Sequence, residues 1–232
     1  MNQITIFIIC ILFAFGLMYQ CLRSGYLKSL NKALLQSNFE RVQEILNQPK
    51  AKLLLSEYNR DLYQARIYYL SKDETKLIAH LRDMMNKSYE KADTEQYLTL
   101  YYHTFVNENN REWALELLEQ IHKLENDKLI RCCDWTKRVL LDECNELVDE
   151  ITAALDNKDY YGFPLGTCAY LIGVQKKRLA AYEEAMQWFD AAKDVFQKRD
   201  IYRPVILKEL EALKEMGYAM PEKPQRVNKQ RK

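Results

Sequence analysis

The side chains best suited to metal or redox chemistry are the cysteines and histidines, and their spacing decides what they can do. A structural zinc site draws thiolate and imidazole ligands from short, regular separations such as C-x-x-C pairs. The chain has six cysteines and three histidines, but no C-x-x-C pair and no histidine at ligand spacing from a cysteine. We therefore expect no metal site, and we expect free thiols that pack as small apolar side chains. The residues concerned are Cys10, Cys21, Cys132, Cys133, Cys144, Cys168, His80, His103 and His122. If the domain were exported, the last four cysteines could instead form two disulfides.

Nucleophilic catalysis and nucleotide binding also have recognisable patterns. The chain has no G-x-S-x-G nucleophile elbow. The segment from Gly162 to Gly166, GFPLG, has two glycines, but neither the spacing that cradles a phosphate nor a following Lys-Ser/Thr pair. Paired carboxylates such as Glu183-Glu184 fit a solvated helix face. We therefore expect a protein that is not an enzyme and that needs no cofactor.

Composition limits the fold class. Glycine and proline together number 11 of 232 residues, or about 5%, whereas the average share of these two residues in proteins is about 12%. Runs of alternating β-branched residues are also missing, so the sequence predicts an all-α protein. With 48% apolar and 29% charged residues the chain is suited to fold, and its formal net charge of +1 gives no reason to expect a nucleic acid partner.

The first element that the sequence predicts is a membrane anchor. Residues 4–22 form an uncharged run of 19 residues, which as a helix spans about 28 Å, close to the hydrocarbon thickness of a bilayer. Arg23, Lys28 and Lys32 follow it, so the positive-inside rule predicts an external amino terminus and a cytoplasmic location for the rest of the chain. A cleaved signal peptide is disfavoured by the large residues after the run, a lipoprotein by Met18-Tyr19-Gln20 ahead of Cys21, and a soluble helix by the lack of a polar face.

Helical segments separated by short polar breaks make up the remainder. Ser71-Lys72-Asp73-Glu74 fits a capping box that begins a helix. Near the end, residues 204–216 place Ile206, Leu210, Leu213 and Met216 on one stripe, and Gly217 is suited to end that helix. The final segment, residues 219–232, contains five cations and one anion and is expected to be disordered.

One helix face recurs along the chain. The residues that share the position in the first turn of each second helix are Val42, Leu77, Ala114, Val148 and Ala185, with spacings of 35, 37, 34 and 37. Four residues later the same face carries Leu46, Leu81, Leu118, Thr152 and Phe189. A pair of helices cannot bury its apolar face alone, so this period predicts units that stack on one another.

The last of these units resembles a tetratricopeptide repeat. Ile172-Gly173, Ala185, Phe189 and Ala192 fall at that family's Leu-Gly, Ala, Phe and Ala positions. The resemblance implies a right-handed solenoid of about five helix-turn-helix repeats over residues 25–200. It would follow an anchor at residues 1–24 and precede a capping helix at residues 201–218.

In that family the first helices line a concave groove that binds a peptide. Carrying the register over places Asn31, Arg66, His103, Lys137 and Val174 in the groove, with Lys177 one turn after Val174. Cations in such a column would suit an acidic peptide or a carboxylate. We therefore expect a membrane-anchored adaptor or scaffold that binds a partner protein; the alternative is a regulatory module that senses a ligand or peptide.

Overall fold

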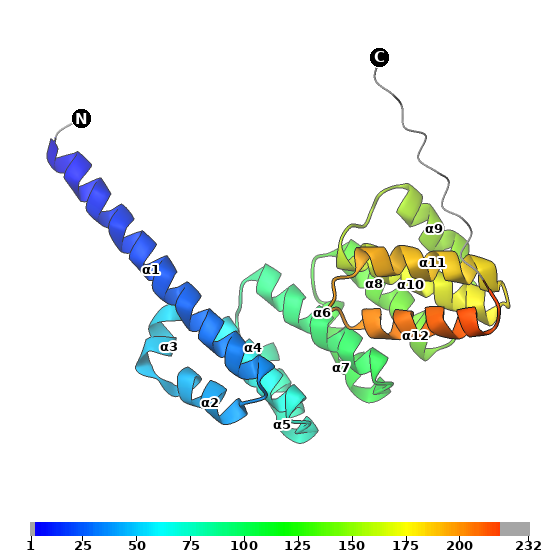
Figure 1. The fold of residues 1–232 in the computed structure, drawn as a ribbon, viewed down its shortest axis with the longest axis horizontal. Coiled ribbons are helices and arrows are strands. Elements are labelled where there is room, and N and C mark those ends of the chain that lie inside the picture. Colours follow the sequence, from blue (N-terminus) through cyan, green and yellow to red (C-terminus); the bar gives the residue numbers. More distant parts are fainter. Residues whose placement is uncertain (1–2, 219–232) are drawn as a thin grey trace, which may run out of the picture. The chain divides into compact units, whose positions relative to one another are not determined.

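The computed structural model describes residues 3–218, and every regular element in that range is helical (Figure 1). The predicted all-α fold class is therefore confirmed. The chain divides into two compact units, residues 1–94 and residues 95–232, and the division falls within α6. The helices before the division are α1 (Gln3–Leu35), α2 (Phe39–Asn47), α3 (Pro49–Leu54), α4 (Glu57–Leu70) and α5 (Glu74–Met85). They are followed by α6 (Lys91–Asn107), α7 (Arg111–Ile121), α8 (Asp127–Thr136), the π-helical turn η1 (Lys137–Leu141), α9 (Val148–Asp156), α10 (Phe163–Arg178), α11 (Tyr182–Val195) and α12 (Tyr202–Glu215).

Helix α1 combines an exposed apolar half with a half that packs. Its apolar residues from Ile6 to Leu22 are exposed, and this half extends beyond the other helices of its unit (Figure 1). The helix is long and apolar enough to span a membrane. It continues without a break past the predicted boundary at residue 24, and Leu30 and Ala33 are buried against α2 and α4. One continuous helix therefore joins the candidate span to the core of the first unit.

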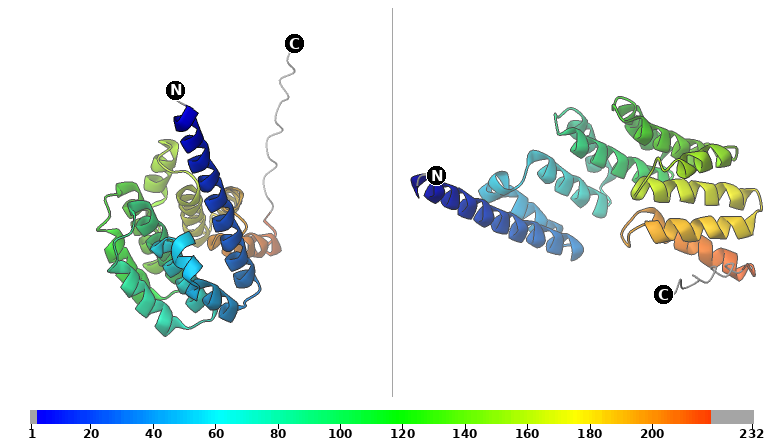
Figure 2. Two further views of the ribbon diagram at one scale, coloured as in Figure 1. Left: turned by 90° about the vertical axis from the view of Figure 1, so that its left-hand side faces the viewer. Right: turned by 90° about the horizontal axis from the view of Figure 1, so that it is seen from above.

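The second unit is organised around α10, which contacts α8, α9, α11 and α12. Figure 2 shows α10, α11 and α12 side by side. Gly173 makes the close approach of α10 to α11 possible, because a Cβ atom there would lie 2.6 Å from the Phe189 ring. Ala185, at the predicted contact position of α11, is fully buried. Glycine and alanine thus bring these two helices together at their most crowded point.

The turn that ends the first helix of each pair recurs with the same period as the sequence pattern. The residues with positive φ at these turns are Ser37, Lys72, Asn109, Glu143 and Ala180, and their spacings are 35, 37, 34 and 37. After four of them the next residue is the N-cap of the following helix: Asn38, Asp73, Asn110 and Ala181. The residue four positions after each of these caps is buried: Val42, Leu77, Ala114 and Ala185.

Two local predictions about helix starts are wrong. Ser71 does not cap α5, because the left-handed turn at Lys72 must be completed first; instead the Asp73 carboxylate accepts a hydrogen bond from the Lys76 amide over 3.2 Å. In the fourth pair, Val148 was predicted at the repeated first-turn position, but the N-cap is Leu147, so Val148 is only the first residue of α9. The buried first-turn position is therefore Ile151, and Val148 is only half-buried.

The C-terminal helix α12 largely follows prediction. Ile206, Leu210 and Leu213 are buried, and Gly217 has φ 91°, the left-handed conformation predicted for its end. Met216 was predicted on the buried stripe but is 55% exposed, because α12 ends at Glu215 and Met216 lies in the turn. The predicted basic tail, residues 219–232, lies outside the described residues.

Candidate functional site

The predicted groove residues fall in both units, and in the first unit two of them lie together. The Tyr63 hydroxyl on α4 donates a hydrogen bond to Asn31 Oδ1 on α1 over 2.9 Å. The Arg66 guanidinium, one turn along α4, lies 5.6 Å from the centre of the Tyr63 ring. A cation over an aromatic face is held by the ring quadrupole. Asn31, Tyr63 and Arg66, named here the α1–α4 patch, thus form one connected group.

Arg66 in the α1–α4 patch has no counter-ion among residues 3–218. Burial raises the pKa of Tyr63 despite the opposing effects of Arg66 and the hydrogen bond to Asn31, so the phenol stays neutral and acts as a donor. Among the residues that the structure describes, no carboxylate forms an ion pair with Arg66, which is half-buried. A guanidinium in this state retains donors that fit a carboxylate in bidentate geometry. Asn31, at the Tyr63 hydroxyl, is exposed and adds an amide to the patch.

His103 does not lie at a surface, so its predicted place in a groove is corrected. Its side chain is 1% exposed, and it is surrounded by the rings of Tyr102, Phe163 and Tyr202 with centroids 5.1 to 5.5 Å away. His103 Nδ1 and the Tyr202 hydroxyl are hydrogen bonded at 2.8 Å. Burial lowers the pKa of His103 to about 3, so the imidazole is neutral at physiological pH. His103 therefore links α6 to α12 inside the core and offers no charge to a partner.

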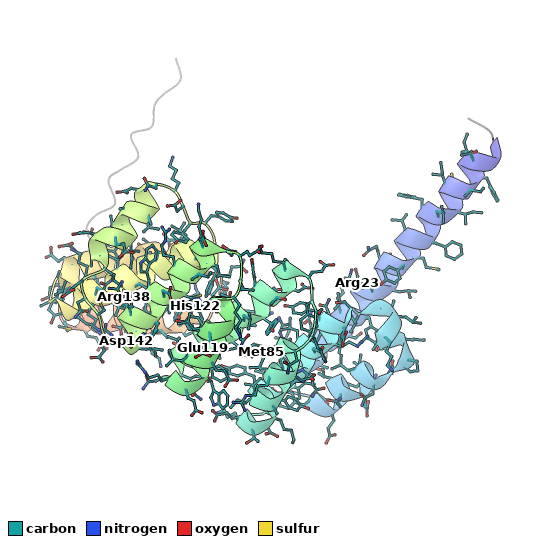
Figure 3. All side chains as sticks on the ribbon, turned by 180° about the vertical axis from the view of Figure 1, so that it is seen from behind. Arg23, Met85, Glu119, His122, Arg138 and Asp142 are labelled. Atoms are coloured by element: carbon teal, nitrogen blue, oxygen red, sulfur yellow. The ribbon has the colours of Figure 1, made fainter. Side chains whose placement is uncertain are left out.

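Lys137 lies in the π-helical turn η1 and forms an ion pair within its own unit. Its Nζ is 2.6 Å from one carboxylate oxygen of Asp142, and Arg111 Nη2 is 2.6 Å from the other oxygen. Figure 3 labels Asp142, which ends η1, and Arg138, which belongs to η1. The hydrogen bonds from Lys137 and Arg111 hold the pKa of the Asp142 carboxyl below its usual value. Lys137 therefore has an intramolecular carboxylate partner, which it shares with Arg111.

Lys177 is also neutralised within the second unit. Its Nζ forms a short ion pair with Glu209 of α12, 32 residues along the chain. The neighbouring Lys176 pairs with Glu184 of α11 over 2.6 Å. Val174, in the same predicted column, is half-buried and packs against the apolar core. In the second unit Lys177 thus links α10 to α12, whereas Lys137 pairs with the residue that ends its own turn.

Three of the six thiols lie in the core, where small apolar residues are expected, whereas Cys10 and Cys21 are exposed and Cys144 is half-buried. Cys132, Cys133 and Cys168 are buried and free, and burial raises the pKa of Cys133 far above that of an ordinary thiol. A thiol held in its neutral form is a poor nucleophile and a poor metal ligand. Within residues 3–218, no group of three or more His, Cys, Asp or Glu side chains could hold a metal ion.

Three features of these sites have no clear signal in the sequence. Tyr63 connects Asn31 to Arg66 from a position outside the predicted column, and Asp142 and Glu209 neutralise lysines that the column singled out. The burial of His103 has a partial signal, because α6 is rich in aromatic residues on several sides: Tyr97, Tyr101, Tyr102 and Phe105 are all buried.

Comparison with known proteins identifies no relative: no family model, no curated protein and no solved structure matches this chain.

Proposed function

We propose that this protein is a membrane-anchored adaptor whose stacked helix pairs, similar to tetratricopeptide repeats, bind an acidic segment of a partner protein at the α1–α4 patch. The observation that carries the proposal is that Arg66 lacks a carboxylate partner among the described residues, whereas Lys137 and Lys177 each have one. An arginine held over an aromatic ring, beside an exposed amide, is a common way to bind a carboxylate. The partner segment would therefore supply the carboxylate.

The anchoring half of the proposal rests on α1. The exposed apolar half of this helix and the packed half that carries Asn31 belong to one continuous element. A bilayer would cover the exposed leucine, isoleucine and phenylalanine side chains, whose transfer out of water is favourable. The cations Arg23, Lys28 and Lys32 would then hold the folded units in the cytoplasm.

The stacking half rests on the recurrent turn. A left-handed residue, an N-cap directly after it and a buried residue four positions later recur in four helix pairs. Repeated supersecondary units generally bury their faces against their neighbours. The packing of α10, α11 and α12 side by side supports this arrangement for the C-terminal pair and its capping helix. In this proposal the protein acts by binding, without catalysis, cofactor or nucleic acid.

Affinity capture from detergent-solubilised membranes tests the function. The full chain and the Arg66→Glu variant would be captured in parallel, and retained proteins identified by mass spectrometry. Arg41→Glu is the matched control, because Arg41 is an exposed cation of the same unit that already pairs with Glu44 over 2.8 Å. We expect a reproducible partner with an acidic segment that Arg66→Glu loses and Arg41→Glu keeps. Equal retention by wild type and Arg66→Glu would reject the patch as the binding site.

A further inference from the structure

The short helix α3 lies beside the end of the apolar part of α1. The Tyr19 hydroxyl donates a hydrogen bond to the Leu53 carbonyl oxygen over 3.3 Å, and α3 contacts α1. Tyr19 belongs to the last turn of the uncharged run at residues 4–22. Any bilayer that surrounds this run therefore ends at the level of α3.

The side chains of α3 divide into a buried residue and an exposed set that suits a lipid interface. Ala51 is fully buried, whereas Leu53 is 75% exposed, and Lys50 and Lys52 are exposed on either side of Ala51. The helix sequence PKAKLL contains no acidic residue. Within the described part of the chain, neither lysine forms an ion pair with a carboxylate. An apolar side chain flanked by cations is the composition typical of a helix that lies at a lipid interface.

We propose that α3 is a second membrane contact, with Leu53 inserted among the lipids and Lys50 and Lys52 bound to anionic headgroups of the bilayer that α1 crosses. This inference rests on the proposed anchoring. Lysine stems can lie along apolar surface while their ammonium groups reach the phosphates. Anionic lipid attracts cations near the surface, and this attraction falls off within a Debye length. A contact at this level would set how deep α1 sits and which side of the first unit faces the lipid.

Spin labels on the full chain in lipid nanodiscs measure the depth of α3. Labels would be placed in three variants, Ile9→Cys, Leu53→Cys and Leu35→Cys, in a background that removes the more accessible native thiols. That background carries Cys10→Ala, Cys21→Ala and Cys144→Ala and leaves the buried cysteines. Leu35 is the matched control, because it is an equally exposed leucine of the same unit at 66% exposure. It lies about 20 Å further along α1 than Leu22.

We expect oxygen to reach the labels at residues 9 and 53 well, and a water-soluble nickel chelate to reach them several-fold less than the label at residue 35. If residue 53 is as accessible to the chelate as residue 35 while residue 9 is in lipid, α3 is not a membrane contact and the anchor stands. If residue 9 is itself accessible to the chelate, the anchoring proposal fails and this inference fails with it.

The headgroup contact is tested by changing the lipid. In nanodiscs that contain phosphatidylserine, residue 53 should be several-fold less accessible to the chelate than in pure phosphatidylcholine, and the pair Lys50→Gln and Lys52→Gln should abolish this difference. The control pair, Arg41→Gln and Lys76→Gln, removes exposed cations of the same unit that pair with Glu44 and Asp73, and should preserve the difference. Equal accessibility in the two lipids for the wild type would overturn the assignment of Lys50 and Lys52 to anionic headgroups.

Discussion

The predicted groove residues have different surroundings in the two units. In the first unit, Asn31 and Arg66 lie at either side of Tyr63, and Arg66 has no carboxylate partner among the described residues. In the second unit, His103 is buried, and carboxylates of the same unit form ion pairs with Lys137 and Lys177. We therefore propose a binding surface only where a cation at a repeated position has no carboxylate partner among the described residues.

The largest expected effect is on binding of the partner, when a charge reversal in the first unit is compared with charge reversals in the second. Arg66→Glu should cost several kcal/mol of binding to the acidic partner, because like charges would face each other across the interface. Lys137→Glu and Lys177→Glu should leave that binding unchanged, since both lysines already have intramolecular partners. Titration of each detergent-solubilised variant with the captured partner gives the three affinities. A loss of binding in either lysine variant that matches the loss in Arg66→Glu would erase the difference between the units.

A smaller but clear effect is expected from the crowded contact of the second unit. Gly173→Ala should destabilise the second unit by about 1 to 3 kcal/mol, because the new Cβ would overpack the Phe189 ring, which lies 2.6 Å from the Cβ position. Gly25→Ala is the matched control, since its Cβ would meet nothing within 4 Å. In thermal unfolding experiments in detergent, only Gly173→Ala should lower the midpoint temperature. Equal midpoints for the two variants would mean that α10 and α11 are less closely packed than described.

The repeated pattern was predictable because helix geometry acts locally. Residues three, four and seven positions apart lie on one face of a helix, so the apolar face that carries Val42, Leu77, Ala114 and Ala185 could be found from periodicity alone. The fourth pair keeps a buried residue, Ile151, four positions after its N-cap but departs from the spacing, because η1 and the segment after Glu143 move the N-cap to Leu147. A π-helical turn has no distinctive residue pattern that periodicity could register.

The pairing of charges was not predictable, because it depends on contacts distant in sequence. Lys177 meets Glu209 across 32 residues, and Arg111 meets Asp142 across 31. Both glutamate and aspartate are common on solvated helices, so neither signals a partner. The exposed apolar half of α1 was predictable for the opposite reason, since an uncharged run of this length has few other uses.

His103 makes the second unit acid-sensitive in a way that the first is not expected to share. The folded pKa of about 3 lies below the usual value near 6.5, so the unfolded chain binds the proton more readily. Stability is therefore complete above about pH 6.5 and falls by about 1.4 kcal/mol per pH unit below it, or about 2 kcal/mol by pH 5. Denaturant unfolding at pH 7 and pH 5, compared for the wild type and His103→Gln, measures this change in the free energy of unfolding. The variant should lose the part of the pH dependence that this single imidazole contributes, and an unchanged dependence would show that His103 is accessible to protons when folded.

The smallest effect should come from removing the ion pair of Lys177. The side chains of Lys177 and Glu209 are 37% and 27% exposed, and pairs this close to solvent contribute between about 0 and 1 kcal/mol. Lys177→Met keeps the length and apolar stem of the side chain, so the loss of stability should stay within that range and shrink as salt is raised. Unfolding of the wild type and the variant at low and high salt measures it, with binding of the acidic partner followed in the same samples. Because Lys177 is already paired with Glu209, its substitution should not change binding of the acidic partner. Weaker binding of the partner by Lys177→Met would mean that the second unit also contributes a cation to the interface.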